Sequence, residues 1–248
     1  MRVAGLVTAL RTLTLLPIPG RDAPRLSHAL PWFPWVGLML GALLSLAAWT
    51  LARLTAWPEA AALLIVAGSA LLSGGLHLDG LADWADGFWG ARDRETVLRI
   101  MKDSRIGAFG VIALGLVLGA QWLCLTRLLQ AGAYPAVVAS FVISRCVMVE
   151  LAVSQPYARP EGGTAQGFVA DATARHRMAA LGGTLLILVL LSRGHWIALI
   201  PAAAGWLFAQ GFGRVCRRRI GGITGDVLGA AAELTHTLVL FAYALGVS

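Results

Sequence analysis

The chain has 248 residues, of which 58% are apolar and only 13% are charged, and its mean hydropathy is +0.74. Soluble domains carry about 45–50% apolar and roughly 25% charged residues, so the composition excludes an ordinary soluble domain and indicates an integral membrane protein. Three cysteines without paired spacing give no reason to expect a disulfide framework or a zinc site: Cys124, Cys146 and Cys216.

The first apolar stretch, residues 3–16, is interrupted by Arg11 and ends in Pro17-Ile18-Pro19. This pattern fits a short helix at the membrane interface better than a cleavable signal or a full span. Seven charge-poor runs follow, most of them near the ~20 residues that cross hydrocarbon: 34–52, 60–76, 107–126, 133–153, 178–192, 195–213 and 227–247. We therefore expect an all-α integral membrane protein, a polytopic bundle of six or seven transmembrane helices plus the short N-terminal interfacial helix, forming a single domain over 1–248.

The positions of Lys and Arg predict how this bundle is oriented. If all seven runs cross, sixteen of the 20 basic residues face one side, which the positive-inside rule identifies as the cytoplasm. The net charge of +7 thus sets orientation in the bacterial cytoplasmic (inner) membrane, and we expect a lipid bilayer, not nucleic acid, as a partner. The three long polar loops, 77–106, 154–177 and 214–226, then share the cytoplasmic side. This favours a site at the membrane surface over a transport path.

The first polar loop opens with the most acidic segment of the chain. Six of the 13 acidic residues lie between positions 79 and 103, and Asp79, Asp83 and Asp86 follow i, i+4, i+7 spacing. On a helix these three carboxylates share one face, where like charges repel unless a cation lies among them. No basic residue occurs from 77 to 91, so a hard divalent ion such as Mg²⁺ is the expected partner. His77 could be a ligand, a base or a hydrogen-bond partner of a ligand.

The same loop also supplies cations. Lys102 and Arg105 flank Asp103 just before the next apolar run. An acidic metal site beside Lys and Arg suits a diphosphate, because both kinds of cation neutralise phosphate charge. We expect Asp103 to join the metal ligands or act as the base, Lys102 and Arg105 to act in catalysis, and Arg92 to contact the substrate. Three further residues fit ordinary surface ion pairs: Arg94, Glu95 and Arg99.

The later polar loops offer further candidate contacts. The third reads Gly221-Gly222-Ile223-Thr224-Gly225-Asp226 and leads into the last run. Its glycine N–H groups and the Thr224 hydroxyl could hold an anion at a helix start, while Asp226 could equally be a plain N-cap. With an exposed cation from the middle loop, the expected substrate contacts are Arg159, Gly221, Gly222, Thr224 and Asp226. Ionisable residues within the apolar runs are either functional or paired with each other: Arg145, Glu150, Glu233 and His236.

The longest motifs of the chain lie in these polar loops. They read His77-Leu78-Asp79-Gly80-Leu81-Ala82-Asp83-x-Ala85-Asp86-Gly87, Met101-Lys102-Asp103-Ser104-Arg105-Ile106-Gly107-Ala108-Phe109-Gly110 and Gly221-Gly222-x-Thr224-Gly225-Asp226-x-Leu228-Gly229-Ala230. In this order and spacing the chain resembles the cobalamin synthase family, the adenosylcobinamide-GDP ribazoletransferases, from Arg11 to the last run. It departs at Trp84, where the family commonly has Thr, and at His236, where a second acid is expected.

The resemblance implies that the chain joins adenosylcobinamide-GDP to α-ribazole, or to its 5′-phosphate, and releases GMP. The run Asp83-x2-Asp86-Gly87-x3-Ala91-Arg92 is also similar to the CDP-alcohol phosphotransferase signature with one residue added. A CDP-alcohol phosphotransferase, a membrane prenyltransferase and a cation-coupled transporter are the alternative functions. A prenyltransferase would need a second Asp-rich motif, and the later loops hold only three scattered acids: Glu161, Asp171 and Asp226. The preferred acceptor and the oligomeric state stay open.

Overall fold

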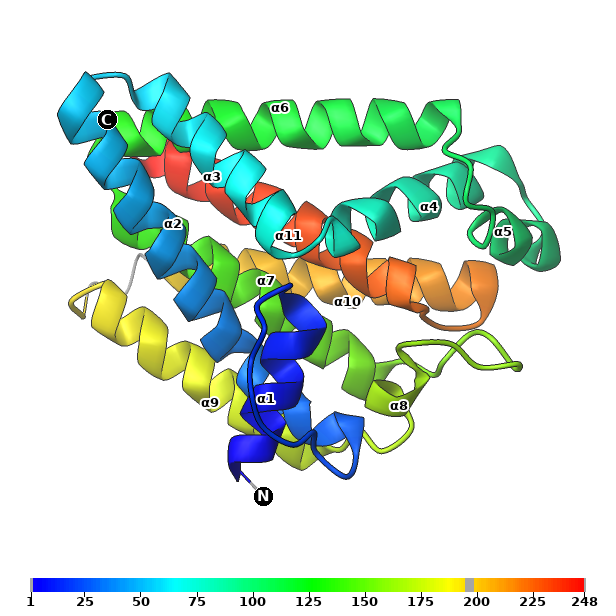
Figure 1. Ribbon diagram of the computed structural model, residues 1–248. Helices are drawn as coiled ribbons and strands as arrows, with labels where there is room; N and C mark the ends of the chain where they lie inside the picture. Colours follow the sequence, from blue (N-terminus) through cyan, green and yellow to red (C-terminus); the bar gives the residue numbers. More distant parts are fainter. Residues whose placement is uncertain (1, 195–198, 248) are drawn as a thin grey trace.

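The computed structural model describes residues 2–194 and 199–247, and every regular element in them is helical (Figure 1). This confirms the all-α prediction. The elements are α1 (Arg2–Leu13), the 3-10 helix η1 (Leu26–Trp32), α2 (Phe33–Thr55), α3 (Pro58–Leu72), α4 (Leu76–Gly90), α5 (Arg94–Ile100), α6 (Ala108–Gln130), α7 (Tyr134–Ser154), α8 (Gln166–Val169), α9 (Ala174–Leu191), α10 (Ile200–Ile220) and α11 (Gly225–Gly246).

Five helical segments in the described residues are long and apolar enough to cross a membrane: η1 with α2, α6, α7, α9 and α11. A sixth is reached if α3 and α4, which meet at 87°, count as one broken span. Of the predicted six or seven spans, the lower number is therefore reached when the broken pair is counted as one, and the N-terminal helix is short as expected. The predicted run 195–213 begins outside the described residues. The helix that contains the rest of it, α10, is not among the candidate spans. Its last two turns carry four arginines, which lower its hydropathy: Arg214, Arg217, Arg218 and Arg219.

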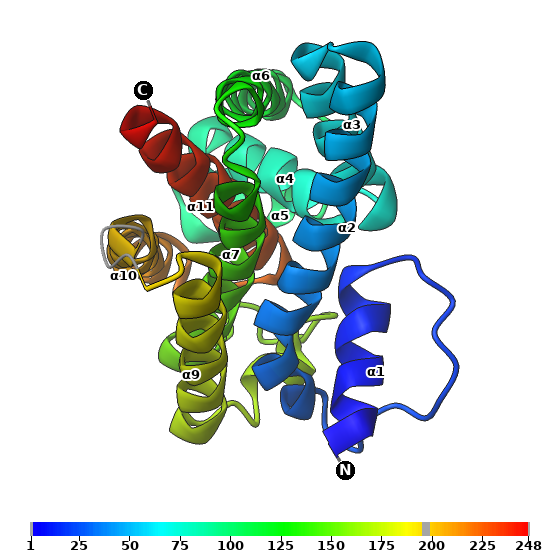
Figure 2. The ribbon, with the colours of Figure 1, turned by 90° about the vertical axis from the view of Figure 1, so that its left-hand side faces the viewer.

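The centre of the bundle is α7. Of its membrane-spanning window 89% is buried, and it packs against α2, α9, α10 and α11 (Figure 2). The helices around it expose large apolar side chains, among them Leu116 and Leu123 of α6 and Leu190 of α9. An apolar surface of this extent suits a lipid environment, so the core lies along α7 and the outer helices face the bilayer.

The right-angled junction of α3 and α4 is made by two glycines. Gly74 and Gly75 have φ of +62° and +71°, a left-handed conformation that side chains with a Cβ rarely adopt. The N–H of Gly75 bonds to the Ala70 carbonyl at 2.8 Å and closes the end of α3. The acidic motif therefore starts a new helix with a new direction.

The three polar loops lie together on one side of the bundle, at the right of Figure 1, whereas the α2–α3 and α6–α7 turns lie at the left. Backbone hydrogen bonds join the second and third loops, from Ala158 N–H to the Ile223 carbonyl (2.8 Å) and from Ile223 N–H to the Pro156 carbonyl (2.9 Å). The Arg94 guanidinium ties the first loop to both, donating to the carbonyls of Ile220 (2.8 Å) and Ala158 (2.9 Å). The predicted convergence of these loops is confirmed.

Candidate functional site

The acidic motif forms the first wall of the site. Asp79 and Asp83 lie one turn apart on α4, Asp79 exposed and Asp83 half-buried, as the i, i+4 spacing predicts. Within the described residues neither carboxylate makes a hydrogen bond or an ion pair, and both are within electrostatic range of Asp226 on α11. Two carboxylates without partners beside a third give the site an excess of negative charge.

A close crossing of α4 and α11 brings these acids together. A Cβ on Gly80 would lie 2.8 Å from the backbone oxygen of Asp226 and 2.9 Å from its Cα. On the facing helix, a Cβ on Gly229 would lie 3.2 Å from the Cα of His77. Because the two backbones touch at these small residues, the Asp79 and Asp226 side chains enter the same space.

Asp226 is held by the middle loop. Arg159 donates to its Oδ2 at 2.8 Å, and the Thr224 hydroxyl donates to the same oxygen at 3.2 Å. The Arg159 side chain is only 11% exposed, so the prediction of an exposed cation is wrong. Asp226 is also not the N-cap of α11, because Thr224 accepts the Val227 N–H at 3.3 Å and fills that position. The other carboxylate oxygen of Asp226 has no partner among the described residues.

Asp86 has hydrogen-bond partners that its spacing from Asp79 and Asp83 does not predict. Its two oxygens accept the N–H groups of Gly107 (2.7 Å) and Gly110 (2.8 Å), and the side chain is buried. A Cβ on either glycine would lie 2.5 Å from this carboxylate. Asp86 is therefore a charged cap that accepts the N–H groups of Gly107 and Gly110 at the start of α6 and complements the dipole of that helix.

The predicted catalytic residues of the first loop lie at the exposed rim. Asp103 pairs with Arg105 at 2.6 Å, and Lys102 pairs with Glu161 of the middle loop. The Arg105 guanidinium lowers the pKa of Asp103 to about 2, and Lys102 lowers the pKa of Glu161. The structure does not bring Asp103 into contact with Asp79 or Asp83. Arg92 is exposed and makes no hydrogen bond or ion pair within the described residues.

The glycine turn before α11 packs against the middle loop of the same chain. Gly221, with φ of +87°, ends α10, and its N–H bonds to the Arg217 carbonyl. Gly222 is buried, and a Cβ there would clash with the Pro156 carbonyl. The turn is thus built to hold the middle loop in place.

Two arginines that sequence reasoning did not select hold the loops together. Besides Arg94, described above, Arg219 donates to the carbonyls of Phe88 (3.1 Å) and Ala91 at the end of α4. Arg94 was expected to make surface ion pairs. The acceptors are backbone carbonyls, so no signal in the side-chain pattern could have revealed these contacts.

The ionisable residues inside the bundle have local partners. Glu233 accepts from Gln121 (2.8 Å), and Glu150 accepts from Gln210 (2.8 Å). Arg145 donates to Ser144 and lies over the Phe141 ring, against which His236 also packs. None of these contacts joins two of the four residues, so the expected pairing with each other is not found among the described residues, and the partners are mainly neutral side chains.

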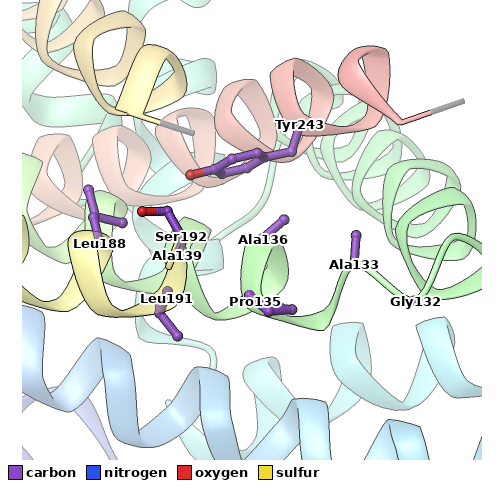
Figure 3. Close-up of a pocket in the computed structure, with 9 residues that line it drawn as sticks. All are labelled: Gly132, Ala133, Pro135, Ala136, Ala139, Leu188, Leu191, Ser192 and Tyr243. Carbon is purple, nitrogen blue, oxygen red and sulfur yellow. The ribbon is translucent and has the colours of Figure 1, made fainter. Parts of the chain in front are cut away.

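Two cavities are lined by the acids of the site. One of about 590 Å³ is lined by Asp79, Asp83, Arg11 and Ser104, and a smaller, more apolar one of about 270 Å³ is lined by Asp79, Asp226 and His77. Asp79 lines both, so it stands where they meet. A third cavity of about 370 Å³ lies at the other ends of α7 and α11, beside Tyr243 (Figure 3). The third cavity is remote from the acids, since 17 residues of α11 separate Tyr243 from Asp226.

Fold and site together define a polytopic helical membrane protein with a carboxylate- and arginine-lined site on one side of the bundle. A family model described as Cobalamin-5-phosphate synthase matches residues 5–244, and the chain belongs to this family of enzymes of cobalamin synthesis.

Similar proteins agree with this assignment. The adenosylcobinamide-GDP ribazoletransferase of Chlorobium chlorochromatii (strain CaD3) is 49% identical over 244 residues, covering 98% of this chain and 96% of that protein. The protein of the same name from Chlorobaculum parvum is 50% identical over 248 residues, with the same coverage. That from Syntrophobacter fumaroxidans is 40% identical over 244 residues, covering 96% of each chain. No solved structure matches the chain.

Proposed function

We propose that this protein joins adenosylcobinamide-GDP to α-ribazole, or to its 5′-phosphate, with release of GMP. The products are adenosylcobalamin or its 5′-phosphate. The family match over residues 5–244 supports this reaction. The observation that carries the chemistry is the pair of unpartnered carboxylates, Asp79 and Asp83, facing Asp226 across the α4–α11 crossing.

The donor set fits Mg²⁺. Among the described residues no three His, Cys, Asp or Glu side chains lie close enough together to hold a metal ion by themselves. Mg²⁺, however, is usually bound by one or two carboxylates together with waters and substrate phosphates, and it seldom has an all-protein cage. One or two of Asp79, Asp83 and Asp226, the last through its free oxygen, would supply such a set, whereas Asp86 is already occupied by two N–H groups. Bound there, Mg²⁺ would neutralise the diphosphate and the charge that develops on the departing phosphate.

The reaction forms one bond from oxygen to phosphorus and breaks another. A ribose hydroxyl attacks the phosphorus nearer cobinamide and releases its proton to water. The bond from this phosphorus to the bridging oxygen breaks, and that oxygen leaves with GMP. Arg159 is positioned by Asp226 to hold phosphate charge on one side. Lys102 and Arg105 are engaged in exposed ion pairs, which solvent screens and which contribute little to stability. Lys102 can therefore leave Glu161, and Arg105 can leave Asp103, to bind a phosphate oxygen with little loss of free energy.

Asp103 is better suited to orienting the Arg105 side chain than to acting as a general base. Its pKa of about 2 keeps it ionised at neutral pH, but it also makes the carboxylate a weak base. We assign to it the orientation of Arg105 at the rim, and we place Arg92 at the outer edge of the substrate site.

The decisive experiment supplies the purified protein, in detergent with Mg²⁺, with labelled α-ribazole and adenosylcobinamide-GDP. We expect the corrinoid product and GMP in equal amounts, both abolished by a chelator and restored by Mg²⁺. Parallel reactions with CDP-diacylglycerol or a prenyl diphosphate test the two enzymatic alternatives. Product from either of these, with none from adenosylcobinamide-GDP, would overturn the proposal.

We further propose that the site faces the cytoplasm in the bacterial inner membrane. The excess of Lys and Arg in the converging loops supports this orientation. Ser104 is exposed in these loops, and Ala131 is exposed at the α6–α7 turn on the other side. In a background without the three buried cysteines, Ser104→Cys should resist an impermeant thiol reagent in intact cells and react after lysis. Ala131→Cys should react in both, and the opposite pattern would invert the topology.

A further inference from the structure

The cavity of about 270 Å³ between α4, α7 and α11 is distinct in character from the rest of the site. We call it the base cavity. Its walls are mainly apolar, formed by Phe33, Phe168, Met148, Leu228 and Ala152, while the carboxylates of Asp79 and Asp226 also line it. A binding space of this kind selects a ligand that is apolar over most of its surface and is joined to a polar group near the acids.

One polar side chain is buried in this wall without a partner. His77 is 1% exposed, it lines the base cavity, and neither of its ring nitrogens makes a hydrogen bond to any residue that the structure describes. A buried polar group left unsatisfied is costly. The ring nitrogens are fully buried, so a ligand with one suitably placed nitrogen or oxygen would relieve this cost once the imidazole turns toward the cavity. A neutral imidazole then offers one donor and one acceptor.

The size of the cavity restricts the ligand further. Small-molecule sites usually measure about 300–1,000 Å³, so this cavity lies below that range and suits a single flat ring system. The two phenylalanines that line it lie with ring centroids 5.8 Å apart and tilted by 58°. Aromatic walls favour a flat aromatic ligand over a saturated one.

We infer that the base cavity binds the bicyclic aromatic base of the acceptor nucleoside, an inference that rests on the proposed function. Of the groups in the two substrates, a corrin ring is too large for this cavity. Guanine carries several donors and acceptors that its apolar walls could not satisfy. The base of α-ribazole is a dimethylated benzimidazole, whose single free ring nitrogen matches the single unpartnered histidine. With the base in this cavity, the ribose lies at its mouth, beside Asp79 and Asp226.

The test narrows the cavity and measures each substrate separately. Ala152 lines the base cavity and is 2% exposed, and Ala139, 13 residues earlier on the same helix, lines the remote cavity of Figure 3 and is 3% exposed. In Ala152→Phe we expect the KM for α-ribazole to rise at least tenfold while that for adenosylcobinamide-GDP stays within twofold. Ala139→Phe is the matched control and should change neither KM. Thermal unfolding of both variants in detergent, and the milder Ala152→Leu, separate a blocked cavity from a damaged fold.

Equilibrium dialysis with labelled α-ribazole alone tests the cavity without turnover. His77→Leu should weaken this binding about tenfold, and His77→Gln, which keeps a donor, should recover part of it. Unchanged α-ribazole binding in Ala152→Phe, with loss of a co-purifying lipid, would overturn the inference in favour of an acyl chain. A rise confined to the KM for adenosylcobinamide-GDP would overturn it in favour of the nucleotide. Product formation from CDP-diacylglycerol only would instead defeat the proposed function itself.

Discussion

Gly80→Ala probes the contact that assembles the site. The added Cβ would lie 2.8 Å from the Asp226 backbone oxygen, where ordinary van der Waals contact begins at 3.4 Å. The obstructing atoms belong to the backbone, so they cannot rotate away as a side chain would. The α4 and α11 helices must therefore separate by about 0.6 Å at this point.

The size of the effect follows from this shift. Overpacking of a closely packed contact costs about 1–3 kcal/mol of stability. A misplacement of about 1 Å can lower a rate roughly 100-fold, so a shift of about 0.6 Å should lower kcat/KM roughly ten- to 100-fold. The loss arises because Asp79 and Asp83 move with α4 while Asp226 stays on α11.

The assay is GMP release at several concentrations of each substrate, with thermal unfolding measured on the same preparations. Gly119→Ala is the matched control, because it also lies within a helix and a Cβ there would meet no atom within 4 Å. It should leave kcat/KM unchanged and stabilise the protein by about 0.4–1 kcal/mol. If Gly80→Ala keeps kcat/KM within twofold of the parent, the close crossing of α4 and α11 does not position the carboxylates.

Four other outcomes follow from the site. Asp83→Asn should lower turnover about 10²–10³-fold at saturating Mg²⁺, the scale of losing one key electrostatic group; near-normal turnover would remove it from the metal ligands. Asp86→Asn should destabilise by about 1–3 kcal/mol, since the amide keeps one of two acceptor oxygens, and leave the Mg²⁺ dependence unchanged; a raised Mg²⁺ requirement would contradict the capping role. The lowered pKa of Asp103 means that its ion pair with Arg105 stabilises the folded protein above the ordinary value of 3.8 and is lost only as the pH falls towards 2. Because Asp103 is already ionised at every pH above its ordinary value, the pH dependence of kcat/KM should not change in Asp103→Asn, and a displaced profile would restore Asp103 as the titrating base. An acceptor whose benzimidazole lacks both methyl groups should bind roughly tenfold more weakly, at about 0.8 kcal/mol for each buried methyl, as measured by dialysis; equal binding would place the methyl groups outside the cavity.

Charge and periodicity were sufficient to predict the architecture in outline. The scarcity of charge over long runs identifies membrane helices, and the excess of Lys and Arg in three loops predicts that these loops lie on one side. The i, i+4 spacing correctly places Asp79 and Asp83 on one turn of a helix. All these signals depend on the types of side chain and their order, and both can be read directly from the sequence.

The remainder depends on backbone groups and on partners distant in sequence. The apolar run 60–76 conceals the left-handed pair Gly74-Gly75, so the break between α3 and α4 was not predicted. Asp86 resembles its neighbours in spacing, but its partners are N–H groups 21 and 24 residues later. Arg94 likewise finds a carbonyl 126 residues away. Every residue carries such backbone groups, so composition gives no sign of which one a side chain will select.

The capping of α6 by Asp86 bears on how the protein moves during turnover. Because a buried carboxylate would be uncovered if α4 slid along α6, these two helices must move as one body. Release of a product as large as a corrinoid then requires motion elsewhere. The exposed pairs Lys102–Glu161 and Asp103–Arg105 are the weakest links around the acids. Opening and closing should accordingly be confined to the rim, and amide hydrogen exchange should be fast at residues 102–105 and slow at Gly107 and Gly110, whose N–H groups bond to Asp86.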